Sequence, residues 1–243
     1  VKRTLAEYYT RKKTIDLDPV RPKIKLITIF KWFLICILIG IFSGSASAFF
    51  LMALEFVTQI RNNHDWIIWL LPIGGLLVGL SYYYWGESVV KGNNLLLEEY
   101  EKPQKTIPFK MAPLVLLGTL LTHLFGGSAG REGTAVQMGG AIADQFTKLF
   151  NLDNTERRAL IILGISAGFA SVFGTPLAGA IFALEVVYFC KISVKSSILS
   201  FVVAYFAYYT VELWAVHHTH YSIPIIPEMN PENLLWIIPS SIL

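Results

Sequence analysis

Two long apolar runs, residues 32–54 and 66–85, limit what this chain can fold into. Each is about as long as the roughly 20 residues that an α-helix needs to cross a bilayer. Only 15% of the 243 residues are charged and 54% are hydrophobic, whereas about 25% of the residues in a typical soluble domain are charged. A transmembrane β-barrel would alternate apolar and polar residues in short segments, which these continuous runs do not. The sequence therefore predicts an all-α, polytopic membrane protein.

The apolar segments and the breaks between them predict membrane helices of unequal length. We expect them at about residues 30–60, 66–85, 111–125, 135–150, 158–172, 176–190 and 196–216. Several are too short for a full crossing and are interrupted by Gly or Pro, which is typical of transporters whose broken helices end at an ion site near the midplane. Small residues at helical spacing predict close helix packing. The pairs are Gly40 and Gly44, Gly75 and Gly79, and Gly164 and Gly168.

The polar connections between these helices are expected at residues 61–65, 87–110, 151–157 and 217–233. None of them resembles an independent domain. The chain begins with Val1 rather than Met and ends inside a fresh apolar segment, residues 234–243. We therefore expect it to be part of a longer protein.

The N-terminal arm, residues 1–28, predicts the orientation of the chain. Its basic residues outnumber its acidic ones beside the first span, and such an excess favours the cytoplasmic side of the membrane. The arm is too long and too charged for a secretory signal peptide, so we expect the first span to be retained. The formal net charge of +3 is interpreted as a topology signal. We expect no nucleic-acid partner, because that would need a basic face on a soluble fold.

The cysteine and histidine residues predict neither a metal site nor a cofactor. Cys36 and Cys190 lie in apolar segments, which favours buried thiols over a disulfide framework or a zinc site. Three histidines lie together in a polar connection, but they lack a carboxylate partner and do not share a helix face. They are His217, His218 and His220.

The stretch most informative for function is residues 126–140, GGSAGREGTAVQMGG, which sets Arg131 and Glu132 among six glycines. An ionisable residue within a membrane span is costly, and it marks an ion path, a proton relay or a buried pair. A phosphate-binding loop is not indicated, because the Gly-Lys-Ser/Thr ending is absent and no strand precedes the glycines. Two structural alternatives remain open for Glu132: it pairs with Arg131, or it caps its own helix.

The glycines of this stretch predict an anion site. Gly127, Gly130 and Gly133 permit positive φ and the close approach of an ion, and residues 134–150 are expected to form the helix that follows. A helix begins with free N–H groups and the positive end of its dipole, which together favour a bound anion. An ionised Glu132 would occupy that site itself and would leave it when protonated. The residue is therefore a candidate gate and proton carrier.

Two motifs together resemble the CLC family of chloride channels and proton-coupled anion antiporters. The first is GREG at residues 130–133 before a helix, and the second is FGTPLAG at 173–179 with an apolar stretch ending in Glu185. The resemblance covers most of residues 30–216. It implies two inverted halves of tilted and broken helices in a homodimer, each subunit holding its own anion path. Residues 29–243 are then a CLC-type transmembrane domain comprising the first half of that fold.

The resemblance also implies where the ion binds. Glu132 corresponds to the gating and proton-carrying glutamate of the family, and GNNLL at residues 92–96 stands where the anion loop Gly-Ser-Gly-Ile-Pro usually lies. The second-half loop Gly-x-Phe-x-Pro and the inner tyrosine of the family have no counterpart in this sequence, so we expect the anion site to need them for completion. The predicted anion-binding residues are Gly92, Asn93, Asn94, Gly130, Arg131, Gly133 and Thr134.

Three departures from the usual pattern favour the fluoride-exporting branch of the family. Thr134 replaces the proline of GREGP, Asn93 replaces the chloride-coordinating serine, and Val186 follows Glu185 where proton-coupled chloride transporters carry a second glutamate. Fluoride is smaller and a better hydrogen-bond acceptor than chloride, so an amide donor at Asn93 suits it. The alternative for Asn93 is a turn asparagine that bonds to its own backbone.

The resemblance therefore implies a proton-coupled fluoride antiporter that moves fluoride out and protons in. The expected location is a bacterial inner membrane, with the N-terminus in the cytoplasm. Two alternatives remain: a chloride channel or chloride–proton antiporter of the same family, and an inactive or interaction-only fragment that lacks the second half of the pore. We do not expect an enzyme, because no nucleophile–base pair or metal cluster accompanies Glu132.

Overall fold

The computed structural model describes residues 26–187 and 193–216. Within these residues the chain is helical and contains no strand, which confirms the all-α prediction. The elements are α2 (Leu26–Asn63), η1 (Asp65–Leu70), α3 (Leu71–Trp85), η2 (Glu87–Val89), α4 (Asn93–Glu101), α5 (Met111–Leu124), α6 (Arg131–Leu149), α7 (Asn154–Phe173), α8 (Pro176–Val186) and α9 (Val194–Leu213). Residues 1–25 of the N-terminal arm, Cys190 and the three clustered histidines lie outside the described residues, and the last three residues of the arm belong to α2.

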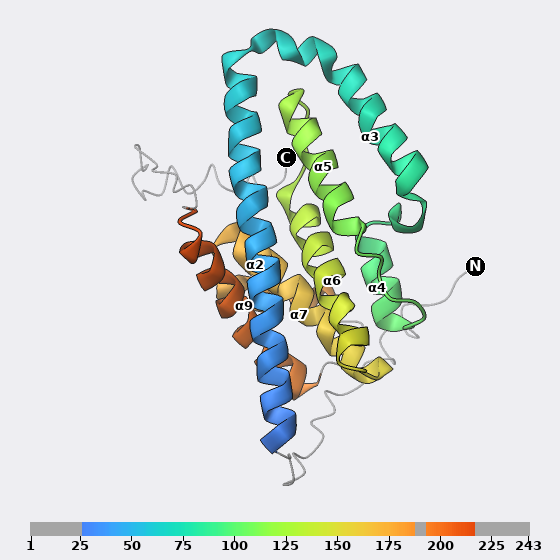
Figure 1. The fold of residues 1–243 in the computed structure, drawn as a ribbon, viewed down its shortest axis with the longest axis vertical. Coiled ribbons are helices and arrows are strands. Elements are labelled where there is room, and N and C mark those ends of the chain that lie inside the picture. The colour runs from blue at the N-terminus through green and yellow to red at the C-terminus, as the bar shows by residue number, and fades with distance from the viewer. Residues whose placement is uncertain (1–25, 188–192, 217–243) are drawn as a thin grey trace, which may run out of the picture.

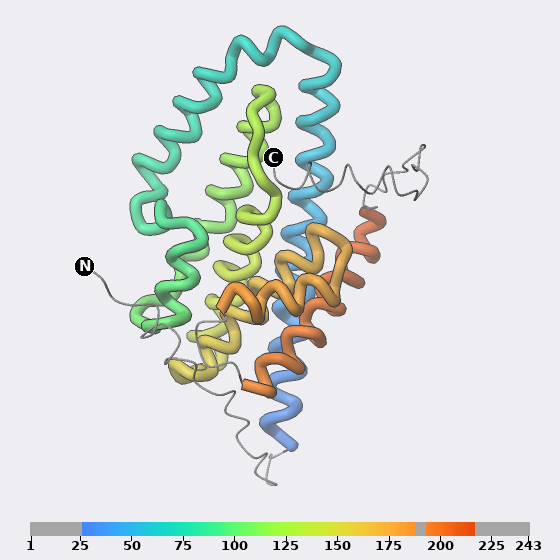
Figure 2. The backbone as a smooth tube through the Cα atoms, turned by 180° about the vertical axis from the view of Figure 1, so that it is seen from behind, coloured from blue at the N-terminus to red at the C-terminus, as the bar shows by residue number. Residues whose placement is uncertain are grey.

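The helices form a bundle, and α2 runs along most of its length (Figure 1). Helices α5 and α6 lie beside α2, α8 and α9 lie on the side that Figure 2 turns toward the viewer, and α3 arches away from the bundle. Within the residues that the structure describes, three segments are long and apolar enough to cross a membrane, namely Leu26–Asn63, Asp65–Trp85 and Val194–Leu213. Helices α5 and α8 are apolar but shorter. The predicted mixture of long and broken helices is thus present.

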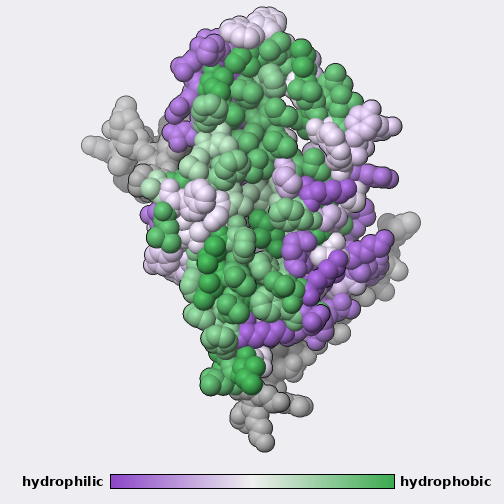
Figure 3. Space-filling model, viewed as in Figure 1, coloured by the Kyte–Doolittle hydropathy of each residue, from purple (hydrophilic) through white to green (hydrophobic). Residues whose placement is uncertain are grey.

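The outer surface has the distribution of polarity that a bilayer requires. Figure 3 shows hydrophobic residues over most of the face that α2 presents, while hydrophilic residues gather toward the side where α4 lies. Large apolar side chains are exposed along η1 and α3, including Trp69 at 83% and Tyr83 at 77%. Contact between such side chains and water is unfavourable, whereas contact with the apolar chains of lipids is not.

The FGTPLAG motif joins two helices through a sharp reversal. Helix α7 begins with a capping box, in which the Asp153 carboxylate accepts from the backbone N–H of Glu156 and the Glu156 side chain accepts in return. It ends at Gly174, whose φ of 67° is the left-handed conformation that glycine adopts without steric cost. Helix α8 starts two residues later with Pro176, where a missing N–H costs nothing.

One helix lies where the sequence predicted a polar connection. Residues 87–110 include α4, a short helix whose Leu96 and Tyr100 are buried although acidic residues surround them. These two side chains are four residues apart and therefore share one face. The segment is too short and too polar to show as an apolar run, so the sequence predicted only a polar connection here and missed the helix within it.

The tightest packing in the bundle joins α6 to α7 through small residues. A Cβ atom added to Gly139 would collide with the carbonyl oxygen of Gly164, and one added to Gly168 would collide with that of Ala135. The prediction of close packing at Gly164 and Gly168 is therefore confirmed, because the two backbones approach with no side chain between them.

The other two glycine pairs differ from each other. A Cβ at Gly40 or Gly44 would collide with α9, so this pair also marks a helix contact. Gly75 and Gly79 have no described atom within 4 Å of such a Cβ. For that pair, the prediction of close packing is wrong within the described part of the chain.

We expect Gly139→Ala to destabilise the bundle, because its methyl group would meet the backbone of Gly164 and force α6 away from α7. Overpacking of this kind costs about 1–3 kcal/mol. The midpoint of thermal unfolding in detergent should fall by several degrees. Gly75→Ala is the matched control, because the same methyl group there meets no described atom within 4 Å. An equal fall in both variants would refute the contact as the cause.

Candidate functional site

Helix α6 begins part-way along the length of the bundle rather than at one end of it. After α5, residues 127–130 have no helical structure, and this connection runs back along the bundle before α6 starts (Figures 1 and 2). Gly130 is the N-cap residue, with an extended backbone at φ −71° and ψ 144°. The helix starts at Arg131, so Glu132 lies in its first turn, earlier than the predicted start at residue 134.

Positive φ occurs at a different glycine than predicted. Gly126, with φ 78°, makes the turn that ends α5, whereas Gly127, Gly130 and Gly133 are not among the positive-φ residues described. The expectation of positive φ at those three positions was wrong. At Gly130 the structure instead uses the small size of glycine, because the Glu132 side chain approaches this backbone closely, whereas a Cβ on Gly133 would make only ordinary van der Waals contacts.

The Glu132 carboxylate turns back over the start of its own helix. Its Oε2 atom would lie 2.6 Å from a Cβ on Gly130, so only glycine leaves room for it there. The side chain is exposed. Among the described residues it forms no ion pair with Arg131 and no capping hydrogen bond. Neither structural alternative is therefore realised, and the carboxylate remains at the positive end of the α6 dipole.

The first turn of α4 approaches the same place. Gly92 is the N-cap residue of α4 with φ 56°, a conformation that favours glycine. A Cβ placed on Gly133 would lie 3.6 Å from the amide nitrogen Nδ2 of Asn93. The structure thus brings the GREG motif and the start of GNNLL together. Asn94 and Arg131 are both exposed, and neither makes a side-chain hydrogen bond to a described residue.

Thr134 fixes the start of α6 to α5. Its hydroxyl oxygen is 2.6 Å from that of Thr119, and both side chains are buried. Thr119 in turn donates to the carbonyl of Val115 within α5. The Thr134 hydroxyl also donates to the carbonyl of Gly130, at 3.4 Å, so this side chain is occupied by contacts with α5 and with the N-cap residue of α6.

A buried ion cluster sets the position of α4. The Arg157 guanidinium on α7 bonds the Asp144 carboxylate on α6 through Nε and Nη2, both at 2.7 Å, and its Nη1 is 2.9 Å from Glu99 on α4. The side chains are only 5%, 0% and 12% exposed. Because a paired guanidinium has fixed planar geometry, one residue holds three helices in register.

The remaining hydrogen-bonding groups of the cluster are also satisfied. Asp144 accepts from the backbone N–H of Ile107 at 2.7 Å and from the Thr147 hydroxyl at 2.8 Å. Glu99 accepts from the backbone of Gln104 and Lys105, and Nη2 of Arg157 donates to the Lys105 carbonyl. Buried charges are tolerated only with such complete pairing. The connection after α4 is therefore as fixed as the helices themselves.

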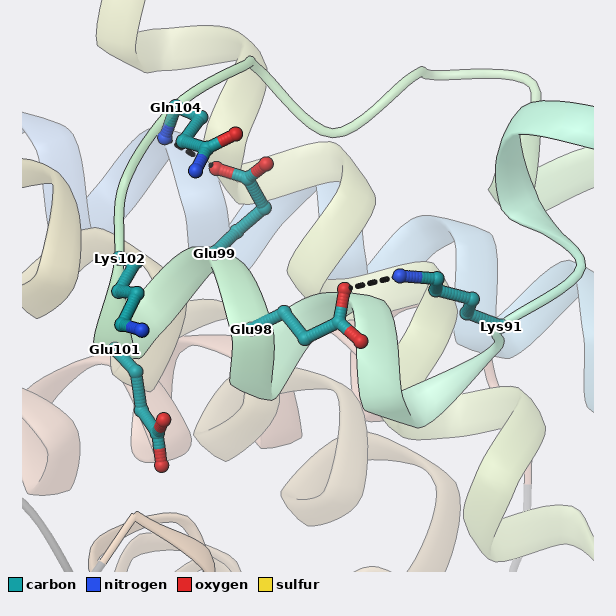
Figure 4. A pocket seen from close by; sticks show the side chains of 6 residues that line it. All are labelled: Lys91, Glu98, Glu99, Glu101, Lys102 and Gln104. Carbon is teal, nitrogen blue, oxygen red and sulfur yellow. Dashed lines mark hydrogen bonds and ion pairs between the residues drawn. The ribbon is translucent and has the colours of Figure 1, made fainter.

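A polar hollow beside α4 is a separate feature. Figure 4 shows Lys91 bonded to Glu98 and Gln104 bonded to Glu99 at its wall. Glutamates outnumber lysines among the residues that line it, which are Lys91, Glu98, Glu99, Glu101, Lys102 and Gln104. The hollow has no excess of positive charge, so it does not offer an anion site.

Sequence reasoning missed three residues of this region. Gln137, one turn after Gly133, lies against Gly92 and Gly133, and its four-residue spacing from Gly133 could have indicated this face. Thr119 and Arg157 act across long sequence separations, so no local signal marks them.

Glu185 is exposed in the last turn of α8. The described ranges contain no group of three or more His, Cys, Asp or Glu side chains suited to a metal.

Comparison with known proteins identifies the class. The sequence model of the family described as Voltage gated chloride channel matches residues 74–243. A solved structure described as a CLC-type fluoride/proton antiporter aligns with a TM-score of 0.79 and 31% sequence identity, over 90% of this chain and 56% of that chain. The chain therefore belongs to the CLC family, an integral membrane family, and the fold predicted from the two motifs is confirmed.

The names of individual relatives refer to two halides, chloride and fluoride. A chloride/fluoride channel protein of Pseudomonas syringae pv. tomato is 47% identical over 226 residues, which are 93% of this chain and 48% of that protein. An H(+)/Cl(-) exchange transporter, ClcA, of Vibrio campbellii is 27% identical over 187 residues, or 69% of this chain and 40% of that protein. The chain spans about half the length of the curated relatives it matches.

Arg157→Leu should destabilise the fold by about 3–5 kcal/mol, because it leaves the Asp144 and Glu99 carboxylates buried without their cation. It should also free the connection after α4, so trypsin should cleave purified protein in detergent faster after Lys105. Lys91→Leu is the control. It breaks an ion pair whose partners are 59% and 54% exposed, and such a pair contributes about 1 kcal/mol at most. Comparable cleavage in both variants would contradict the assigned role.

Proposed function

We propose that this chain forms part of a proton-coupled fluoride antiporter in which Glu132 is both the gate and the proton carrier. The observation that carries the proposal is the position of the Glu132 carboxylate over Gly130, at the start of α6. The Asn93 amide lies above Gly133, the residue that follows Glu132. A negatively charged side chain, an amide donor and a helix N-terminus thus meet at one place.

The chemistry of the gate follows from competition for one site. The start of α6 favours one negative charge, because its first N–H groups have no partner within the helix. The ionised carboxylate provides that charge and excludes an anion. Once protonated, it loses its attraction to the helix end, and an anion can replace it. Each exchange therefore moves a proton and an anion through the same place, which couples their flows.

The choice of fluoride rests on the donor at residue 93. An amide presents two N–H groups, whereas the serine hydroxyl at the corresponding place in the family presents one O–H. Fluoride concentrates its charge in a smaller volume than chloride and therefore holds its water more strongly. More fixed hydrogen-bond donors are needed to replace that water. Thr134 contributes only its backbone N–H to this site, because its side-chain hydroxyl is bonded to Thr119. Gly92, Asn94, Gly130 and Arg131 complete the proposed set.

The proposal includes a membrane setting and a partner. We expect a homodimer in a bacterial inner membrane, with the N-terminus in the cytoplasm and the lipid bilayer around the apolar surface. Fluoride and protons are the expected ions. A chloride channel, a chloride–proton antiporter and a fragment without a pore are the competing functions, and the experiments below separate them.

Glu132→Gln should abolish proton coupling, because an amide cannot carry the proton. We would measure fluoride efflux and pH change together in liposomes, using this chain and also a chimera in which it replaces the matching residues of the Pseudomonas syringae relative. Proton uptake should fall to background while anion flux persists. Glu212→Gln is the control, because Glu212 is also exposed on a membrane helix but lies near the end of α9.

The same assay separates the alternatives. Unchanged proton uptake in Glu132→Gln would remove the assigned role, and chloride flux above fluoride flux in the unaltered protein would favour the chloride functions. Flux through the chimera but not through the chain alone would mean that the chain supplies half of a pore. Flux through neither would overturn the proposal.

Asn93→Ser should shift selectivity toward chloride, because it replaces two amide N–H donors with one hydroxyl. The loss of one hydrogen bond to an ion corresponds to roughly a tenfold fall in the fluoride-to-chloride flux ratio. The exposed Asn63, at the end of α2, provides the control substitution Asn63→Ser. An unchanged ratio in Asn93→Ser would mean that Asn93 is only a turn residue.

A further inference from the structure

Gln137 packs its amide against the start of α4. A Cβ on Gly92 would lie 3.3 Å from the Gln137 Nε2 atom and 3.6 Å from its Oε1 atom. The contact therefore involves the polar end of the side chain and not its methylene stem. Gln137 is half-buried and lies one helical turn beyond Gly133 on α6. Its amide stands between the two helix starts that form the candidate site.

The space above Gly133 is faced by two amide nitrogens. A Cβ on Gly133 would lie 3.6 Å from Nδ2 of Asn93 and 3.8 Å from Nε2 of Gln137, and apart from the helix itself it would meet no other described atom within 4 Å. Neither amide has a hydrogen-bond partner among the residues that the structure describes. Two unpaired donors thus converge on one open point beside a helix N-terminus.

We propose that Gln137 is a second amide donor to the transported anion and, with Asn93, determines the preference for fluoride. The inference rests on the proposed function for the identity of the ion. An anion above Gly133 would receive N–H groups from two helices, α4 and α6, and the missing side chain of Gly133 keeps that point free. Glu132, the preceding residue, is the charged group next to this point.

Amide donors suit a small anion for a physical reason. Neutral N–H groups stabilise an anion without trapping it as a lysine or arginine would, so it can also leave. A hydrogen bond to an ion is stronger than one between neutral groups, and it strengthens as the ion becomes smaller. Two amides at one point therefore favour fluoride over chloride more than one amide does.

A purely structural role for Gln137 makes a different prediction. If the side chain only filled the space against Gly92, an apolar side chain of equal length would serve as well, because that contact requires volume and no donor. Gln137→Met has this property. Its effect on ion preference therefore separates the two roles, since a filler would leave that preference unchanged.

The test measures binding directly, so that it does not depend on transport. Purified protein in detergent would be titrated with sodium fluoride and with sodium chloride by calorimetry. Gln137→Met should weaken fluoride binding by roughly tenfold, with a smaller effect on chloride. Gln145→Met is the control, because this amide of the same helix donates to the carbonyls of Ile107 and Ala141 instead. It should leave both affinities unchanged.

A second variant fills the proposed site. Gly133→Ala adds a methyl group at the point that both amides face, so it should weaken binding of both halides. Fluoride binding equal to that of the unaltered protein in Gln137→Met, or no fluoride binding by the unaltered protein, would overturn the inference. Fluoride binding that Gln137→Met weakens, in a protein or chimera that carries no fluoride flux, would support the amide pair while refuting the proposed antiport.

Discussion

The ion cluster around Arg157 is the interaction on which the arrangement of the site depends. The site has two parts, one on α4 and one on α6, and no described hydrogen bond joins their side chains directly. Arg157 connects them by bonding Asp144 on α6 and Glu99 on α4 from a third helix. Burying three charges is unfavourable unless every group is paired, which is the case here. The cluster therefore contributes geometry more than stability, and it does so from outside the place where the ion would bind.

Some of this fold could be predicted from local sequence and some could not. The long apolar helices and the position of Glu132 at a helix start were predictable, because hydropathy and a charge among glycines are local signals. Helix α4 was not, because its buried face consists of few residues within an acidic segment. The cluster was also hidden, since Arg157 and Glu99 are 58 residues apart and Arg157 lies in what looked like a polar connection.

The glycines illustrate the same limit in more detail. Sequence alone indicates that a small residue is required at Gly130 and Gly133, but not whether the need is for unusual φ or for space. At Gly130 the need is for space, because a carboxylate lies over it. At Gly133 a Cβ would make only ordinary van der Waals contacts, and the unusual φ falls on Gly92 and Gly126. Only the three-dimensional neighbours of a glycine distinguish these two requirements.

The hydrogen bond between Thr134 and Thr119 has a consequence for the speed of events at the site. It fixes the first turn of α6 to α5, while further along the helix Gly139 is locked against Gly164. The helix start therefore cannot slide. Any displacement of the Glu132 carboxylate from Gly130 is a side-chain rotation, which takes picoseconds to nanoseconds, whereas helix movements take microseconds to milliseconds. A movement of this carboxylate therefore requires no movement of the fold, and it can be far faster than a displacement of the helix.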